Sequence, residues 1–86
     1  MNKEDRLSLI RDRLARTFSP DHLEVRDESD QHLGHAGHQG GGRHFAIQIS
    51  ATCFDGVSRV EIHRRIYAVF SDMMPSEIHA LRICVK

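Results

Sequence analysis

The chain has 86 residues, which suffices for one modest hydrophobic core, so we expect a single domain over residues 1–86. Twelve basic residues balance twelve acidic ones, and this balance disfavours tight non-specific nucleic-acid binding, which depends on net positive charge. The sequence has no apolar run near the roughly 20 residues that cross a bilayer, and charged residues occupy its opening where a signal peptide is apolar. The two cysteines form no C-x-x-C pair, so we expect a cytoplasmic protein without a membrane span.

The first part of the chain predicts one helix and one strand. Apolar residues recur at intervals of three and four, at Leu7, Ile10, Leu14 and Phe18. This spacing is typical of an amphipathic helix, which we place over residues 3–17 and which Ser19-Pro20 ends. Polar and apolar residues then alternate over residues 22–26, as expected of a short strand with one buried face.

A glycine-rich segment separates this strand from the next. Residues 31–43 contain five of the six glycines and three of the seven histidines, and their backbone freedom predicts a mobile loop. Alternation resumes over residues 44–50, where Phe45, Ile47 and Ile49 share one face. We therefore predict a second strand that pairs antiparallel with the first.

The rest of the chain predicts a helix and a third strand. Ser58 and Glu61 form a capping box at the start of a helix over about residues 58–74, whose broad apolar face includes Val60. A proline ends this helix, and residues 78–85 have the composition of a strand. A strand, a helix and a strand usually form a parallel crossover, so strands two and three should be parallel. The predicted fold is α+β in the order α-β-β-α-β, with helices on one face of a mixed three-stranded sheet.

Several short motifs follow one another along the chain: Asp27-Glu28-Ser29 with His32, His44-Phe45, Phe54-x-Gly56, His63-Arg64-x-x-Tyr67 and His79-Ala80-Leu81. In this order they resemble the motifs of the BolA family. Together they cover nearly the whole chain, and on this resemblance the chain is identified as a BolA-like protein. The resemblance implies a class II KH-like α+β fold and a binding or regulatory function.

The resemblance further implies a partnership with a monothiol glutaredoxin, in which the two proteins share a bridging [2Fe–2S] cluster. The partner and glutathione supply thiolates and the BolA side supplies histidine, so no cofactor is expected in the isolated protein. By the match to the family motifs, the ligands are His79 and the loop residue His32, with His35 and His38 as alternatives. The implied roles are iron–sulfur and iron homeostasis, transcription regulation or stress response, and the chain alone is expected to be a monomer or a weak homodimer.

The histidines can also be weighed by their chemistry. Imidazole binds zinc, copper, iron and nickel, and it can replace thiolate on one iron of a [2Fe–2S] cluster. The run His32-x-x-His35-x-x-His38 suits such binding, yet a glycine loop is little preorganised, so adventitious metal binding by a flexible connector is the alternative. For His79 the alternative is a strand-start histidine with satisfied hydrogen bonds, and for His63 helical spacing predicts a packed, hydrogen-bonded side chain.

DNA binding is the second functional hypothesis. Arg59, Arg64 and Arg65 cluster in the second helix, and with His63 and Arg43 they are candidates for contacting phosphates or glutaredoxin. The Gly-x-x-Gly turn with which KH domains grip nucleic acid is absent before the long helix. DNA affinity should then be modest and strongly dependent on salt.

Catalysis has little support in the sequence. The chain contains no nucleophile elbow, phosphate-binding loop or paired-carboxylate motif. Ser58 is explained as a helix cap, and Cys53 and Cys84 are expected to be buried or incidental thiols. We therefore expect a binding protein and not an enzyme.

Overall fold

The computed structural model describes residues 2–28 and 43–86. Its helices and strands are α1 (Lys3–Phe18), β1 (His22–Asp27), β2 (His44–Ser50), a short 3-10 helix (Thr52–Phe54), α2 (Arg59–Val69) and β3 (Ala80–Val85). This α-β-β-α-β order confirms the predicted one. The predicted glycine loop lies outside the described residues, except for Arg43.

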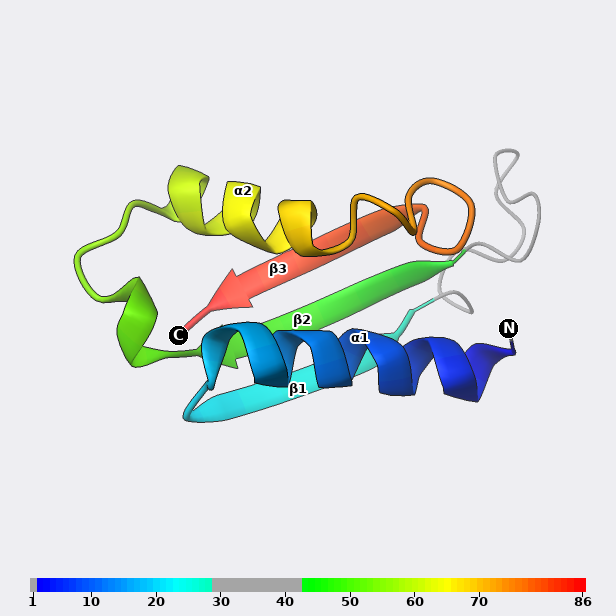
Figure 1. Ribbon diagram of the computed structural model, residues 1–86, viewed down its shortest axis with the longest axis horizontal. Coiled ribbons are helices and arrows are strands. Elements are labelled where there is room, and N and C mark those ends of the chain that lie inside the picture. Colours follow the sequence, from blue (N-terminus) through cyan, green and yellow to red (C-terminus); the bar gives the residue numbers. More distant parts are fainter. Residues whose placement is uncertain (1, 29–42) are drawn as a thin grey trace.

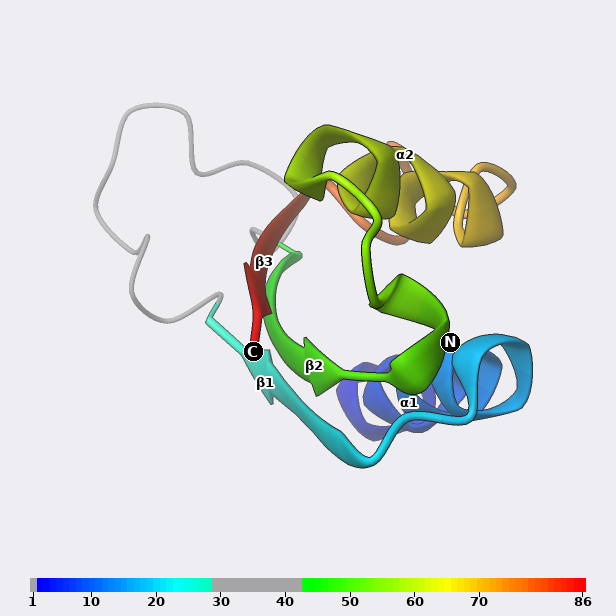
Figure 2. The same cartoon turned by 90° about the vertical axis from the view of Figure 1, so that its left-hand side faces the viewer.

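The three strands form one mixed sheet in the order β1-β2-β3. β1 is antiparallel to β2 and β3 is parallel to it, as predicted. Figures 1 and 2 show α1 and α2 on the same face of this sheet, with no described element over the other face. The crossover through α2 brings the start of β3 beside the start of β2, at one end of the sheet.

The core lies between the two helices and the sheet. Its largest fully buried side chains are Phe45, Phe70, Ile10, Leu14, Ile47, Ile49, Ile66 and Ile78. The central strand contributes three of them because alternate residues of a strand face the same side, so the predicted buried face of Phe45, Ile47 and Ile49 is confirmed. Ile10 and Leu14 belong to the predicted apolar stripe of α1, since residues four apart share a helical face.

Both helices begin at a side-chain cap. The Ser58 hydroxyl accepts a hydrogen bond from the Glu61 N–H at 3.2 Å, which is the Ser58 half of the predicted capping box. Asn2 caps α1 in the same way, with its side-chain oxygen 2.8 Å from the Asp5 nitrogen. Among the described residues, no helix is long and apolar enough to cross a membrane.

The second helix ends earlier than the sequence predicts. The apolar pattern continues to about Met74, yet α2 ends at Val69. The N–H of Phe70 bonds to the carbonyl of Tyr67, three residues earlier, at 3.1 Å, and the guanidinium of Arg13 in α1 donates to the Val69 carbonyl at 3.1 Å. This tighter turn ends the helix, and β3 starts two residues later than predicted.

Val60 lies on the exposed side of α2, although the sequence predicts it on the buried face. Its exposed fraction is 81%, whereas Ile62 and Ile66 are almost fully buried. Residues two apart on a helix differ by about 200° around its axis, so Val60 and Ile62 cannot both face the sheet. The apolar face of α2 is therefore narrower than predicted.

Two arginines of α1 form ion pairs with the connection between α2 and β3. The buried guanidinium of Arg6 donates to the Glu77 carboxylate at 2.8 and 3.0 Å, and this pairing lowers the pKa of Glu77 below its ordinary value. Arg13, two helical turns further on, pairs with Asp72 at 2.6 Å. The two ion pairs hold in place the segment that leads to His79.

Candidate functional site

Two histidines meet where the parallel strands begin. His44 is the first residue of β2, and His79 immediately precedes β3. Parallel strands start at the same end of a sheet, and the register pairs His44 with Ala80, so the two imidazoles are neighbours. Their ring centroids lie 5.2 Å apart, with the ring planes at 69°. His79 is exposed and His44 is half-buried, so solvent reaches the pair.

Backbone hydrogen bonds fix the chain on both sides of this pair. The His79 N–H donates to the carbonyl of Arg43 at 2.9 Å, and the His44 carbonyl accepts from the Glu28 N–H at 2.8 Å. The carboxylate of Glu28, whose side chain is 10% exposed, accepts hydrogen bonds from Arg82 at 2.6 and 3.1 Å. The two imidazoles therefore stand on a preorganised end of the sheet.

The distance between the two imidazole rings suits two ligands of one metal atom, such as zinc or iron. A histidine nitrogen binds zinc at about 2.0–2.1 Å, so two rings on one metal have centroids within about 6.5 Å of each other. The observed separation of 5.2 Å fits this limit. Within residues 2–28 and 43–86, no group of three or more His, Cys, Asp or Glu side chains is placed to hold a metal ion. A tetrahedral site has four ligands, so these two imidazoles alone do not complete one.

His44 is not among the ligands predicted from the sequence. The predicted ligands are His79 and the loop residue His32, with His35 and His38 as alternatives, and these three loop residues lie outside the described part of the chain. The signal that would have found His44 is the predicted parallel pairing of strands two and three, because parallel pairing brings the first residues of both strands together. The structure thus places one further imidazole, that of His44, beside His79.

The arginines and histidine predicted on the second helix do not gather at the imidazole pair. Arg64 and Arg65 both bind the Glu61 carboxylate, at 2.6 and 3.0 Å, which offsets part of their charge. Arg59 begins α2, and Figure 1 shows this helix starting at the end of the sheet opposite to the start of β3. His63 is half-buried and has no hydrogen bond to a described residue, so its predicted hydrogen bond is not found there.

Replacing Glu61 by glutamine should flatten the acid dependence of stability. Hydrogen bonds from Arg64 and Arg65 lower the pKa of Glu61 from 4.5 to about 2. A carboxylate with a lowered folded-state pKa stabilises the fold above its unfolded pKa, and this contribution is lost as pH falls from 4.5 through about 2. Urea midpoints of both proteins across this window check the prediction. Parallel pH profiles for the two proteins would contradict it.

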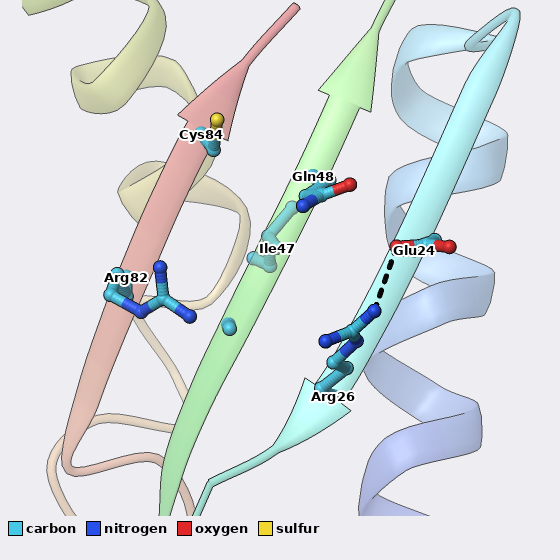
Figure 3. A pocket seen from close by; sticks show the side chains of 7 residues that line it. Glu24, Arg26, Ile47, Gln48, Arg82 and Cys84 are labelled. Carbon is cyan, nitrogen blue, oxygen red and sulfur yellow. Dashed lines mark ion pairs between the residues drawn. The ribbon is translucent and has the colours of Figure 1, made fainter.

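Both cysteines are exposed, so burial, one of the two predicted alternatives, is wrong, and incidental thiols stay the prediction. Cys84 lies on the open face of the sheet, in a shallow hollow beside Gln48 and Arg82 (Figure 3). Alternate residues of a strand face opposite sides, which places Cys84 away from the core. Cys53 lies on the short 3-10 helix, where its sulfur is 3.6 Å from the carbonyl oxygen of Phe18.

The described residues form a small α+β domain with a solvent-accessible imidazole pair at one end of a mixed sheet. Residues 14–86 match the family model described as "BolA: BolA-like protein". The chain therefore belongs to the BolA-like family, as its sequence motifs predict.

Similar proteins include two from Arabidopsis thaliana. The chain is 42% identical over 82 residues to "SufE-like protein 1, chloroplastic/mitochondrial", covering 90% of this chain and 22% of that protein. It is 35% identical over 86 residues to "Protein BOLA1, chloroplastic", covering 96% of this chain and 54% of that protein. The solved BolA domain of SufE1 from Arabidopsis thaliana has a TM-score of 0.81 and 39% identity, covering 100% of this chain and 93% of that one. The chain thus spans only part of the two curated relatives' length.

Proposed function

We propose that this protein binds a monothiol glutaredoxin and co-ligates a bridging [2Fe–2S] cluster through histidine, as a regulatory binding protein and not an enzyme. The observation that carries the proposal is the His44–His79 pair, with ring centroids 5.2 Å apart at the start of the two parallel strands. Membership in the BolA-like family supports it, because the resemblance implies this partnership. The expected setting is iron–sulfur and iron homeostasis, transcription regulation or stress response.

The donor set of the pair suits one iron of such a cluster. A [2Fe–2S] cluster with two imidazoles on one iron has a higher reduction potential than one held by thiolates alone. His79 is the more exposed of the two histidines, so its side chain is the more open to a docked partner. We therefore take His79 as the first ligand, with the glutaredoxin cysteine and glutathione supplying thiolates.

The second nitrogen comes from His44 or from a loop histidine, and we favour His44. His44 already lies beside His79, so its use requires little further ordering of the chain, and preorganised ligands bind more tightly. His32, His35 and His38 stay as the alternatives. Glu28 and Arg43, which flank the segment 29–42, both lie at this end of the sheet. Their position supports keeping the loop histidines as alternatives.

The proposed docking face surrounds the start of β3. The Arg6–Glu77 and Arg13–Asp72 ion pairs hold the preceding connection against α1, so a partner meets a fixed backbone there. Arg43 belongs to this face through its carbonyl bond to the His79 N–H. An arginine at this place suits the carboxylates of glutathione, because guanidinium groups bind carboxylates with two hydrogen bonds.

Three broader predictions belong to the same proposal. The order of the elements and the mixed sheet support the class II KH-like classification. The family match over residues 14–86 supports a single BolA-like domain. A cytoplasmic location stays a prediction, and the two plant relatives carry chloroplastic or mitochondrial names.

Titration into a monothiol glutaredoxin that carries a [2Fe–2S] cluster tests the proposed function. Visible absorption and circular dichroism should change and saturate at a one-to-one ratio, because imidazole replaces another ligand on one iron. A protein that forms no complex and changes neither spectrum would overturn the proposal. DNA binding by the arginines of α2 would then be the function to test, through its salt dependence.

A further inference from the structure

β1 is an edge strand whose outer side is open. It pairs with β2 on one side, and Figure 1 shows no described element beyond it on the other. A hollow of about 250 Å³ lies against this edge, lined by Arg11 of α1 and by residues 23–26 of β1. Open edge strands pair with other chains unless their side chains or bulges prevent it.

The outward-facing peptide groups of β1 belong to its odd-numbered residues. The Glu28 N–H donates a hydrogen bond to the His44 carbonyl. Hydrogen-bonded and non-hydrogen-bonded residue pairs alternate along an antiparallel ladder. The even-numbered residues of β1 therefore turn their N–H and C=O groups toward β2. The Ile49 carbonyl instead accepts a hydrogen bond from the Lys86 N–H, directly after β3, at 2.9 Å, as the same alternation requires in β2. The N–H and C=O groups of Leu23 and Val25 therefore face outward.

We propose that β1 pairs antiparallel with β1 of a second copy of this chain, with the twofold axis at Val25. In this register the outward peptide groups of Val25 bond to those of Val25 in the second copy. Residues at equal distances from the axis also face each other, so Glu24 of each copy lies opposite Arg26 of the other. The two three-stranded sheets then join into one continuous sheet. This inference goes beyond the proposed function and does not depend on it.

The charges of Glu24 and Arg26 are placed for this pairing. Both side chains lie on the open face of the sheet (Figure 3), with exposed fractions of 43% and 69%. Within one chain their ion pair is long, at 3.6 Å, so both groups can bind a further partner. Opposite charges directly across an antiparallel pair stabilise it, and the twofold axis produces two such pairs. A peptide with charges of one sign would bring like charge either to Glu24 or to Arg26, whereas a second copy presents the opposite charge to each of them, which favours a second copy as the occupant.

Arg11 adds a cation on the helix side of the same edge. It lines the hollow beside Leu23 and has no ion pair with a described residue. The twofold axis places Asp27 of the second copy opposite Leu23, on the side of the strand that Arg11 covers. An Arg11–Asp27 pair of opposite charges therefore meets at each end of the interface, in addition to the two Glu24–Arg26 pairs.

Sedimentation equilibrium of the full chain over a range of concentrations tests the inference. The wild-type protein should form a dimer, and Glu24→Arg should raise the dissociation constant about tenfold, because two attractive pairs become repulsive. The double variant Glu24→Arg/Arg26→Glu should restore dimerisation, since it exchanges both signs. Glu4→Arg is the matched control, because it makes the same charge change at an exposed position of α1.

Two further measurements check the fold of each variant and the place of the dimer interface. Circular dichroism establishes that each variant is folded, so that loss of the dimer cannot be attributed to loss of structure. Amide hydrogen exchange at Leu23 and Val25 should slow as the protein concentration rises, because these N–H groups become bonded in the dimer. A wild-type protein that stays monomeric, or a dimer that Glu24→Arg does not weaken, would overturn the inference.

Discussion

Replacing His79 by alanine should abolish the spectral change that this protein induces in a cluster-bearing monothiol glutaredoxin. His79 is the exposed member of the imidazole pair, and its removal leaves His44 without the neighbour that now lies 5.2 Å away. A single remaining imidazole cannot provide the two-nitrogen set that replaces two thiolates on one iron. Visible circular dichroism at a one-to-one ratio measures the effect.

His22→Ala is the matched control for this experiment. His22 is also exposed, but it pairs with Ser50 at the far end of the β1–β2 ladder, about 20 Å from the start of β2. Its replacement should leave the spectral change intact. The change should also be lost in His44→Ala, whereas loss in His32→Ala alone would move the second ligand to the loop. If His79→Ala keeps the full spectral change, the ligand assignment is wrong.

Phe70→Ala should remove much of the free energy of unfolding. Phe70 has an exposed fraction of 0% at the end of α2. Replacing a buried phenylalanine by alanine costs about 3–5 kcal/mol, through lost burial and the cavity left behind. At about 0.05–0.15 kcal/mol per residue, a domain of this size has a total of only about 4–13 kcal/mol. Urea denaturation should therefore show a much lower midpoint.

Val60→Ala is the comparison that makes this prediction specific to the orientation of α2. Val60 is apolar and lies on the same helix, yet its exposed fraction is 81%. Exposed substitutions change the free energy of unfolding by about 0.5 kcal/mol or less. A destabilisation of Val60→Ala as large as that of Phe70→Ala would show that α2 packs with a different face toward the sheet.

The elements with a clear period were predictable from sequence. Intervals of three and four residues located α1 with Ile10 and Leu14 inside, and strict alternation located β2 with Phe45 inside. The end of α2 was not predictable from its apolar pattern. That end depends on Arg13 of α1, which donates a hydrogen bond to the last helical carbonyl from a distant part of the chain.

The candidate site was predictable in part. The family motif pointed to His79, and the structure places His79 exposed at the start of a strand. His44 was missed because the sequence shows it only as the first residue of a strand. Its proximity to His79 follows only from the register in which β2 and β3 pair. The arginine cluster on α2 differs most from its prediction, because the Glu61 carboxylate binds both Arg64 and Arg65.

Local patterns thus sufficed for the order of the elements and for the antiparallel and parallel strand pairings. These features depend on residues close together in the chain and on general rules of strand connection. Tertiary packing alone settled the burial of Arg6, whose partner Glu77 is 71 positions away, the exposure of Val60 and the meeting of His44 with His79. The physical reason is that helix rotation on a sheet and contacts between distant side chains depend on how all the elements pack together, which no short stretch of sequence encodes.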